Sequence, residues 1–237
     1  MHCMDLTLSS AAENLACDEA LLDACEDGSG PEVLRFWEPS EYFVVVGFSN
    51  SVASEVNLEA CKREGIPVLR RCSGGGTILQ GPGCLNYTLI LKIADRPEVE
   101  TIPITNHFVM TKQREAVAKV LGRAVEIRGL TDLCIDGKKF SGNAQRRKRR
   151  ALIFHGTFLL HFDLSLVEKF LTMPSREPDY RKGRPHGQFL MNLNTPTSDI
   201  KTALRNVWRP TSEMAAAPDC RRLIAEKYSR DEWNLKI

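Results

Sequence analysis

The sequence predicts an α+β fold, in which helices and strands are mixed within one domain. Short runs of β-branched and aromatic residues, such as Tyr42–Gly47, are typical of strands. Residues 11–26 carry apolar side chains near the helical period. The two kinds of segment do not alternate regularly as a doubly wound parallel sheet would require. A chain of 237 residues can enclose one substantial core, so we expect a single domain over residues 1–237.

In the first half of the chain, local signals mark where several elements begin and end. Ser10 is a suitable N-cap for the first helix, because Glu13 three residues later completes a capping box, and Gly28 follows the helix. We expect helices at 11–26, 56–64 and 104–121, and strands at 33–37, 42–47, 67–71 and 85–93.

The second half is predicted to begin with short strands and to end with helices. Asp136-Gly137 is typical of a tight turn. Residues 176–187 are rich in Arg, Pro and Gly, which predicts a mobile loop. We expect strands at 126–128, 133–135, 139–140 and 151–162, and helices at 164–171, 198–208 and 219–228.

Composition and charge favour a soluble, cytoplasmic enzyme. The chain is 43% hydrophobic and 26% charged, and its net charge of +2 gives no overall field that would attract nucleic acid. Its apolar runs are far shorter than the about 20 residues of a membrane span, and its N-terminus lacks the features of a signal peptide. We therefore expect neither a nucleic acid nor a membrane as a partner.

The eight cysteines are expected to be reduced and mostly buried. They form no CxxC pair and have no His at zinc-finger spacing, so no metal site made by the protein alone is expected. A disulfide framework would require export of the protein.

The strongest local signal for function is the segment Arg70-Arg71-Cys72-Ser73-Gly74-Gly75-Gly76-Thr77. Consecutive glycines after a strand allow successive N–H groups to surround a phosphate or carboxylate, and paired arginines add the positive charge that such an anion needs. A flexible turn beside a solvated Arg pair is the alternative. The spacing fits neither a Walker A loop nor a dinucleotide-binding motif.

Three further segments carry candidate residues. Lys139 could project into a pocket and stabilise charge at an acyl phosphate, although a hairpin tip with two exposed lysines is the simpler interpretation. His155, within an apolar strand, is more often a hydrogen-bonded core residue than a catalyst. The cationic run Gln145–Arg150 lacks interleaved aromatics, so we expect a solvated loop or a docking surface for an acidic protein.

Taken together, these segments resemble the lipoate–protein ligase A family, whose catalytic domain is related to those of biotin ligases and octanoyltransferases. The family's RRxSGGG pattern is similar to residues 70–79, its Asp and Lys-Phe-Ser-Gly-Asn-Ala-Gln pattern to residues 132–145, and its His-Gly-Thr strand to residues 154–160. Asn14-Leu15-Ala16, Asp18-Glu19 and Asn192-Leu193 fit further family positions. The resemblance covers about residues 5 to 235 and implies a biotin/lipoate ligase-like domain with a mixed, mainly antiparallel sheet flanked by helices.

The resemblance implies that an acyl adenylate lies over the glycines and that Lys139 contacts its phosphate and its carbonyl. It also implies ATP, Mg²⁺ and lipoate as cofactor or substrates, with lipoyl-AMP as the intermediate. The protein partner would be a lipoyl carrier domain of the E2 or glycine-cleavage H type. The residues expected to bind the nucleotide or acyl adenylate are Arg70, Arg71, Ser73, Gly74, Gly75, Gly76, Thr77, Ile78, Leu79, Lys139, Gly142, Ala144, His155, Gly156 and Thr157.

The chain departs from the family pattern in ways that keep alternatives open. Gln80-Gly81 stands where relatives have His-Asp. The sequence ends near where bacterial ligases continue into an accessory domain, so a small accessory subunit is one expectation. A thioester route through Cys72, Cys84 or Cys134 would make the protein an octanoyl or lipoyl transferase. A non-catalytic protein that binds the acyl adenylate or the lipoyl carrier is the third alternative.

Overall fold

The computed structural model describes residues 1–94 and 96–236, and its strands form two sheets. Neighbouring strands of the larger sheet are mainly antiparallel, except that β1 pairs in parallel with both β2 and β11. The larger sheet has the order β11 (Ser212–Glu213), β1 (His2–Asp5), β2 (Val33–Trp37), β6 (Cys84–Lys92), β10 (Ala151–Leu159), β9 (Lys138–Arg147), β8 (Asp132–Ile135) and β7 (Glu126–Arg128). The smaller sheet has the order β4 (Val68–Arg70), β3 (Phe43–Val46) and β5 (Ile78–Gln80).

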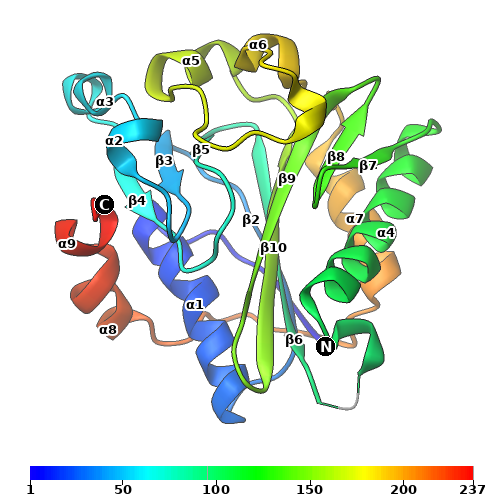
Figure 1. Ribbon diagram of the computed structural model, residues 1–237. Helices are drawn as coiled ribbons and strands as arrows, with labels where there is room; N and C mark the ends of the chain where they lie inside the picture. Colours follow the sequence, from blue (N-terminus) through cyan, green and yellow to red (C-terminus); the bar gives the residue numbers. More distant parts are fainter. Residues whose placement is uncertain (95, 237) are drawn as a thin grey trace.

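Helices cover both faces of the larger sheet, with α1 on one face and the pair α4 and α7 on the other (Figure 1). The helices are α1 (Ala11–Asp27), α2 (Val52–Glu55), α3 (Leu58–Glu64), α4 (Ile102–Leu121), α5 (Val167–Phe170), α6 (His186–Phe189), α7 (Thr197–Trp208), α8 (Arg221–Leu223) and α9 (Asp231–Asn234). Shorter turns are η1 (Pro97–Val99), η2 (Leu164–Leu166), η3 (Asp179–Arg181) and the π-helical turn η4 (Ile224–Tyr228).

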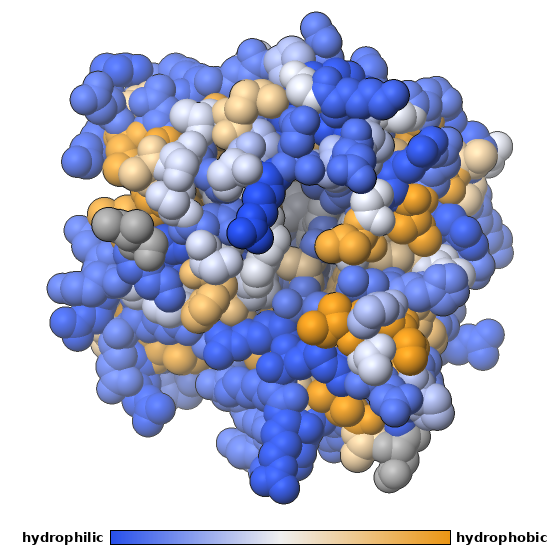
Figure 2. Space-filling model, in the orientation of Figure 1, coloured by the Kyte–Doolittle hydropathy of each residue, from blue (hydrophilic) through white to orange (hydrophobic). Residues whose placement is uncertain are grey.

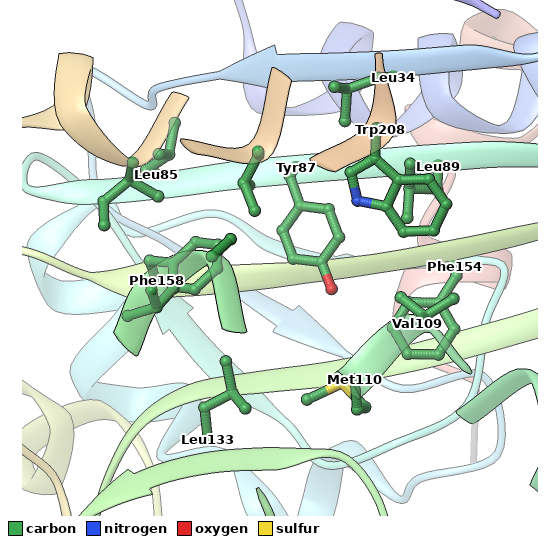
Figure 3. Close-up of a cluster of buried hydrophobic side chains, with 14 of the residues drawn as sticks. Leu34, Leu85, Tyr87, Leu89, Val109, Met110, Leu133, Phe154, Phe158 and Trp208 are labelled. Carbon is green, nitrogen blue, oxygen red and sulfur yellow. The ribbon is translucent and has the colours of Figure 1, made fainter. Parts of the chain in front are cut away.

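The core follows from the period-two alternation of the central strands. On β6, Tyr87 and Leu89 belong to the cluster that packs against α4 and α7, whereas Ile90 packs with Leu21 of α1. Figure 3 shows the α4 side of this core, where the rings of Tyr87, Phe158 and Trp208 lie among aliphatic side chains. The central strands are therefore buried on both faces and form a rigid support for the residues at their ends.

The predicted α+β class and the mainly antiparallel sheet are confirmed. The Ser10–Glu13 capping box begins α1, and Gly28 ends it in the left-handed region with φ of 89°. Strands β1, β5 and β11, and the separation of β3, β4 and β5 into a second sheet, were not predicted. The helix expected at 219–228 is instead α8 followed by η4.

The prediction of a solvated loop for the cationic run was wrong for its first half. Strand β9 continues to Arg147 because it pairs with β10 as far as Leu152. Arg146 donates to the Cys72 carbonyl and Arg147 donates to Thr105 Oγ1 on α4. These cations therefore join β9 to other parts of the fold, and only the end of the run lies in the exposed turn before β10.

All eight cysteines are free, and all are buried, as expected for small apolar side chains. Within residues 1–94 and 96–236, we find no helix with both the length and the apolar character needed to cross a bilayer.

Candidate active site

A cavity of about 800 Å³ opens at the ends of strands β9 and β10. The space-filling view shows a hollow near the centre of this face, below the segments that carry α5 and α6 (Figure 2). One wall is the glycine segment, residues 73–77, which joins β4 to β5. The opposite wall is formed from residues within 174–181. We call residues 172–185, which include this range and its flanks, the wall segment.

The glycine segment lies directly against strands β9 and β10. A Cβ atom built on Gly75 would lie 3.2 Å from the Ala144 Cβ atom on β9. Ser73 Oγ and His155 Nε2, on β10, lie 2.5 Å apart. Gly75 has φ of 87°, a conformation in which a side chain would be strained. The glycines therefore let the backbone pass close to the strand that carries Lys139.

The Arg71 side chain is hydrogen-bonded to the backbone of the glycine segment and fixes its conformation. Its guanidinium donates to the carbonyls of Gly74 at 2.6 Å and Gly76 at 2.8 Å, so it occupies acceptors of this turn. Among the described residues, the N–H groups of Gly75, Gly76 and Thr77 have no hydrogen-bond partner. Burial lowers the pKa of Arg71 to about 10, which leaves it charged at neutral pH. A buried cation beside free N–H groups is suited to an anion.

Lys139 extends into the cavity from the start of β9. Its Nζ lies 2.7 Å from Asp132 Oδ1, and its side chain is 24% exposed. The other carboxylate oxygen, Asp132 Oδ2, accepts a hydrogen bond of 2.7 Å from the Tyr180 hydroxyl of the wall segment. The neighbouring Lys138 is exposed and does not line the cavity. Only one of the two lysines of this turn therefore faces the cavity.

A buried ion pair supports the floor of the cavity. Asp18 on α1 lies 2.6 Å from the guanidinium of Arg35, accepts from Thr88 Oγ1, and lies 3.7 Å from His155 Nδ1. Burial alone would raise the pKa of Asp18, but the charge of Arg35 and the contact with His155 lower it below its ordinary value. His155 thus links Asp18 to Ser73 of the glycine segment. It is a hydrogen-bonded residue that also lines the cavity.

The remaining floor divides into a polar and an apolar region. Gln80, which departs from the family pattern, donates to Asn86 Oδ1 and Thr157 Oγ1, each at 2.8 Å. These buried amides and the hydroxyl satisfy one another. Beyond them the lining is apolar and comes from Leu159, Phe162, Val167, Leu171, Phe189 and Leu190. This region suits a hydrocarbon chain, and its residues come from three separate stretches, at β10, α5 and α6, that no local pattern connected.

Most of the residues predicted for the site meet at this cavity. Those that line it are Arg71, Gly75, Gly76, Thr77, Ile78, Leu79, Lys139, Gly142, Ala144, His155, Gly156 and Thr157. Ser73 and Gly74 lie behind the lining, where they contact Arg71.

Arg70, expected at the nucleotide, lies outside this lining. Its side chain is buried and donates to the carbonyls of Gly47 at 2.7 Å and Asn50 at 2.8 Å, and also to the carbonyl of Trp233 in α9. Because β4 is a strand, Arg70 and Arg71 point in opposite directions. Arg70 therefore holds the C-terminal segment on the smaller sheet.

The three cysteines considered as nucleophiles do not line the cavity either. Cys72, Cys84 and Cys134 are buried, and burial raises the pKa of Cys72 and of Cys84 to about 12. Burial also raises the pKa of Cys134, which donates to the Tyr180 hydroxyl. At Cys72 and Cys134 the effect of burial on the thiol pKa outweighs the opposing effect of nearby cations.

Two polar residues of the site were missed from the sequence. Tyr180 contacts Asp132, and Glu55 contacts Thr77 of the glycine segment. Each comes from a segment without a recognisable motif, so their roles depend on tertiary contacts alone.

Residues 10–207 match the family described as the lipoyl protein ligase A/B catalytic domain. The chain belongs to this family. It is 24% identical to lipoate-protein ligase A subunit 1 of Thermoplasma acidophilum, over 94% of this chain and 92% of that protein. It is also 24% identical to octanoyltransferase LipM of Brevibacillus brevis, over 96% of this chain and 95% of that protein.

Solved structures share the fold. The bipartite lipoate protein ligase of Thermoplasma acidophilum, described together with its E2 lipoyl domain, superposes with a TM-score of 0.83 and 23% identity, covering 99% of this chain and 95% of that one. A lipoate protein ligase from the same organism with bound lipoic acid gives a TM-score of 0.78 at 23% identity, over 99% and 98% of the two chains. The biotin/lipoate ligase-like fold implied by the sequence is confirmed.

Proposed function

We propose that this protein is a lipoate–protein ligase, or the catalytic subunit of one, that forms or uses lipoyl-AMP and transfers the lipoyl group to a carrier lysine. The observation that carries the proposal is the meeting of Lys139 and the glycine segment at one cavity that continues into an apolar region. An acyl adenylate has the same three parts: a charged phosphate, a reactive carbonyl and a hydrocarbon chain.

In the first step, the lipoate carboxylate attacks the α-phosphorus of ATP and pyrophosphate leaves. The free N–H groups of Gly75, Gly76 and Thr77 would hold phosphate oxygens, and Arg71 keeps that turn in place. Lys139 would exchange its contact with Asp132 for one with the phosphate. Mg²⁺ bound to the nucleotide would neutralise further phosphate charge.

In the second step, the amine of the carrier lysine attacks the acyl carbonyl, the bond to phosphate breaks, and AMP leaves. Negative charge develops on the carbonyl oxygen in the transition state. The Lys139 ammonium, placed at the same end of the cavity, would stabilise that charge without forming a covalent bond. An amide between the lipoyl group and the lysine is the product.

Transfer from a thioester is the second candidate, because LipM octanoyltransferases are among the relatives. A cysteine route needs a thiolate beside the acyl carbonyl. The three candidate thiols are buried outside the cavity lining and have raised pKa values, which supports the adenylate route instead.

The protein partners proposed are a lipoyl carrier domain and a small accessory subunit. Support comes from the bipartite ligase of Thermoplasma acidophilum, which shares the fold and was described with its E2 lipoyl domain. Adding the accessory subunit of such a ligase to the assay tests whether adenylation depends on a second chain.

The deciding experiment incubates the pure protein with lipoate, ATP and an apo lipoyl domain, and measures the mass of that domain. An ATP-dependent gain of one lipoyl group supports the ligase. A gain only from an acyl thioester donor, lost on one Cys→Ser substitution, identifies a transferase. Binding of acyl-AMP without modification of the carrier by either donor identifies a non-catalytic binding protein. Lipoate-dependent exchange of pyrophosphate into ATP tests adenylation separately.

A further inference from the structure

Glu55, at the end of α2, has a carboxylate that contacts both walls of the cavity. Oε2 accepts hydrogen bonds from Thr77 Oγ1 of the glycine segment at 2.5 Å and from Asn50 Nδ2 at 2.7 Å. Oε1 accepts from Ser175 Oγ of the wall segment at 2.5 Å. Each oxygen therefore contacts a different wall.

The environment of this carboxylate is unusual. Glu55 is 4% exposed, and no cation within the described residues lies at ion-pair distance from it. Burying a carboxylate without a counter-ion is costly, and here three hydrogen bonds to the charged form offset the cost. Burial would raise the pKa of Glu55, but the donors Ser175, Thr77 and Asn50 lower it below its ordinary value. The Glu55 carboxylate is thus ionised and is held by neutral hydrogen-bond donors. Because these donors belong to different segments of the chain, the carboxylate joins those segments.

The segments that Glu55 joins belong to the cavity. Thr77 lines it, and so do Pro174 and Arg176 on either side of Ser175. The wall segment is also attached to α2 through Thr172, whose N–H donates to the Glu55 carbonyl and whose hydroxyl donates to the Ser54 carbonyl. The charge of Glu55 also raises the pKa of Arg71 against the effect of burial.

We propose that Glu55 is a positioning residue that fastens the glycine segment to the wall segment and so sets the spacing between the two walls that enclose the acyl adenylate. This inference rests on the proposed function for its ligand, but the connection between the walls exists in the free protein. It can therefore be tested without any catalytic assay.

The first test is hydrogen–deuterium exchange of the free protein, followed at the hydrogen-bonded amides of Thr172, Arg181 and Arg184. We expect Glu55→Ala to speed exchange by about tenfold at these amides of residues 172–185 and at the Phe48 amide, which donates to the Ser73 carbonyl of the glycine segment, since opening there no longer breaks bonds to a charged acceptor. Ser175→Ala should speed exchange in residues 172–185 only. Glu59→Ala, on the neighbouring helix and exposed, is the matched control and should leave both regions unchanged.

A conservative variant separates positioning from simple loss of structure. Glu55→Gln keeps the shape and one acceptor oxygen for Thr77 and Asn50, and its amide can donate to the Ser175 hydroxyl, which can reverse its role. Its exchange should therefore fall within about threefold of the wild type. If Glu55→Ala does not fold, Ser175→Ala decides the question. Wild-type exchange in residues 172–185 of Ser175→Ala would overturn the proposal.

Kinetics give the second readout. Because Glu55 does not line the cavity, Glu55→Ala should raise the KM for the acyl substrate by about tenfold and change kcat by less than threefold. An equal loss in kcat without a change in KM would overturn the positioning role. A wild-type protein that transfers no lipoyl group from ATP and lipoate would refute the proposed function, and the exchange results would still decide the role of Glu55.

Discussion

Lys139 Nζ lies 2.7 Å from Asp132 Oδ1, and the other oxygen of this carboxylate accepts a hydrogen bond from the Tyr180 hydroxyl. In the free protein the ammonium is therefore already held in the cavity that the glycine segment also lines. A phosphate entering the cavity would compete with Asp132 for the same cation. The pair keeps the ammonium in place before the ligand arrives, which lowers the cost of ordering it on binding.

Replacing Lys139 by Ala should abolish acyl transfer while the protein stays folded. The side chain is partly exposed in the cavity, so its loss removes little packing but removes the charge that we propose stabilises the transition state. Transfer to an apo lipoyl domain is the measurement, with circular dichroism as the check on folding. Lys138→Ala is the matched control, because Lys138 is the neighbouring lysine and is exposed outside the cavity. Activity of Lys139→Ala above about a tenth of wild type, a barrier change below ~1.4 kcal/mol, would contradict the role.

Gly142→Ala should lower activity by moving the same ammonium. A Cβ atom at Gly142 would lie 2.8 Å from both Cε and Nζ of Lys139, so the flexible end of the lysine must shift. We expect at least a tenfold loss of transfer and a change in unfolding free energy below about 1 kcal/mol. Gly187→Ala is the control, since its nearest neighbour, Glu168 Oε1, would lie at 3.7 Å. Full activity of Gly142→Ala would show that the position of the Lys139 ammonium is unimportant.

None of Cys72, Cys84 and Cys134 should be required for transfer. With a pKa of about 12, Cys72 and Cys84 are ionised at pH 8 in only about one molecule in ten thousand, and they are buried. Each single Cys→Ala variant should keep more than about a third of the wild-type rate, because small buried thiols tolerate this change with modest cost. Mass spectrometry should detect no acyl thioester on the enzyme. A stable acyl adduct on one of these cysteines would favour the thioester route.

Removing the Asp18 carboxylate should destabilise the fold far more than removing an exposed one. Asp18→Ala leaves the fully buried Arg35 without its counter-ion, which costs about 3–5 kcal/mol. Asp23→Ala, which breaks the partly exposed pair with Lys148, should cost less than about 1 kcal/mol. Unfolding in urea measures both. Equal costs would show that the buried pair contributes no more than a surface pair.

The pH dependence of stability follows from the same group. The pKa of Asp18 is lowered in the folded state, so its contribution is complete above the ordinary value of 3.8. It is lost as the pH falls below 3.8 and passes through the folded pKa. Acid unfolding of the wild type should therefore include a loss of stability in this range that Asp18→Asn lacks.

Protease sensitivity should report closure of the wall segment. Arg176 and Lys182 are exposed in the free protein, so trypsin should cleave there. An acyl adenylate bound between the two walls should slow this cleavage by about tenfold, since the segment contacts the ligand-filled cavity. Arg222, exposed on α8 and remote from the cavity, gives an internal control. Unchanged cleavage at Arg176 would remove the case for closure.

Local sequence signals determined much of this fold. The Ser10–Glu13 capping box, the glycine after α1 and the β-branched and aromatic run that forms β3 depend on near neighbours in the chain, and each was recognisable without tertiary information. The glycine segment and Lys139 were likewise identifiable from residue type and motif order. The physical cause of each of these features lies within a few residues of the sequence.

Only the tertiary structure decided which side chains meet. Arg70 and Arg71 are neighbours in sequence, yet one holds the C-terminal segment and the other the glycine segment, because the direction of each depends on the register of β4 within its sheet. The sequence predicts that Arg146 belongs to a solvated run, whereas pairing of β9 with β10 places it beside Cys72. Glu55 joins segments about 20 and 120 residues away, as its bonds to Thr77 and Ser175 show. Contacts over such separations arise from packing of the whole chain, which no local pattern specifies.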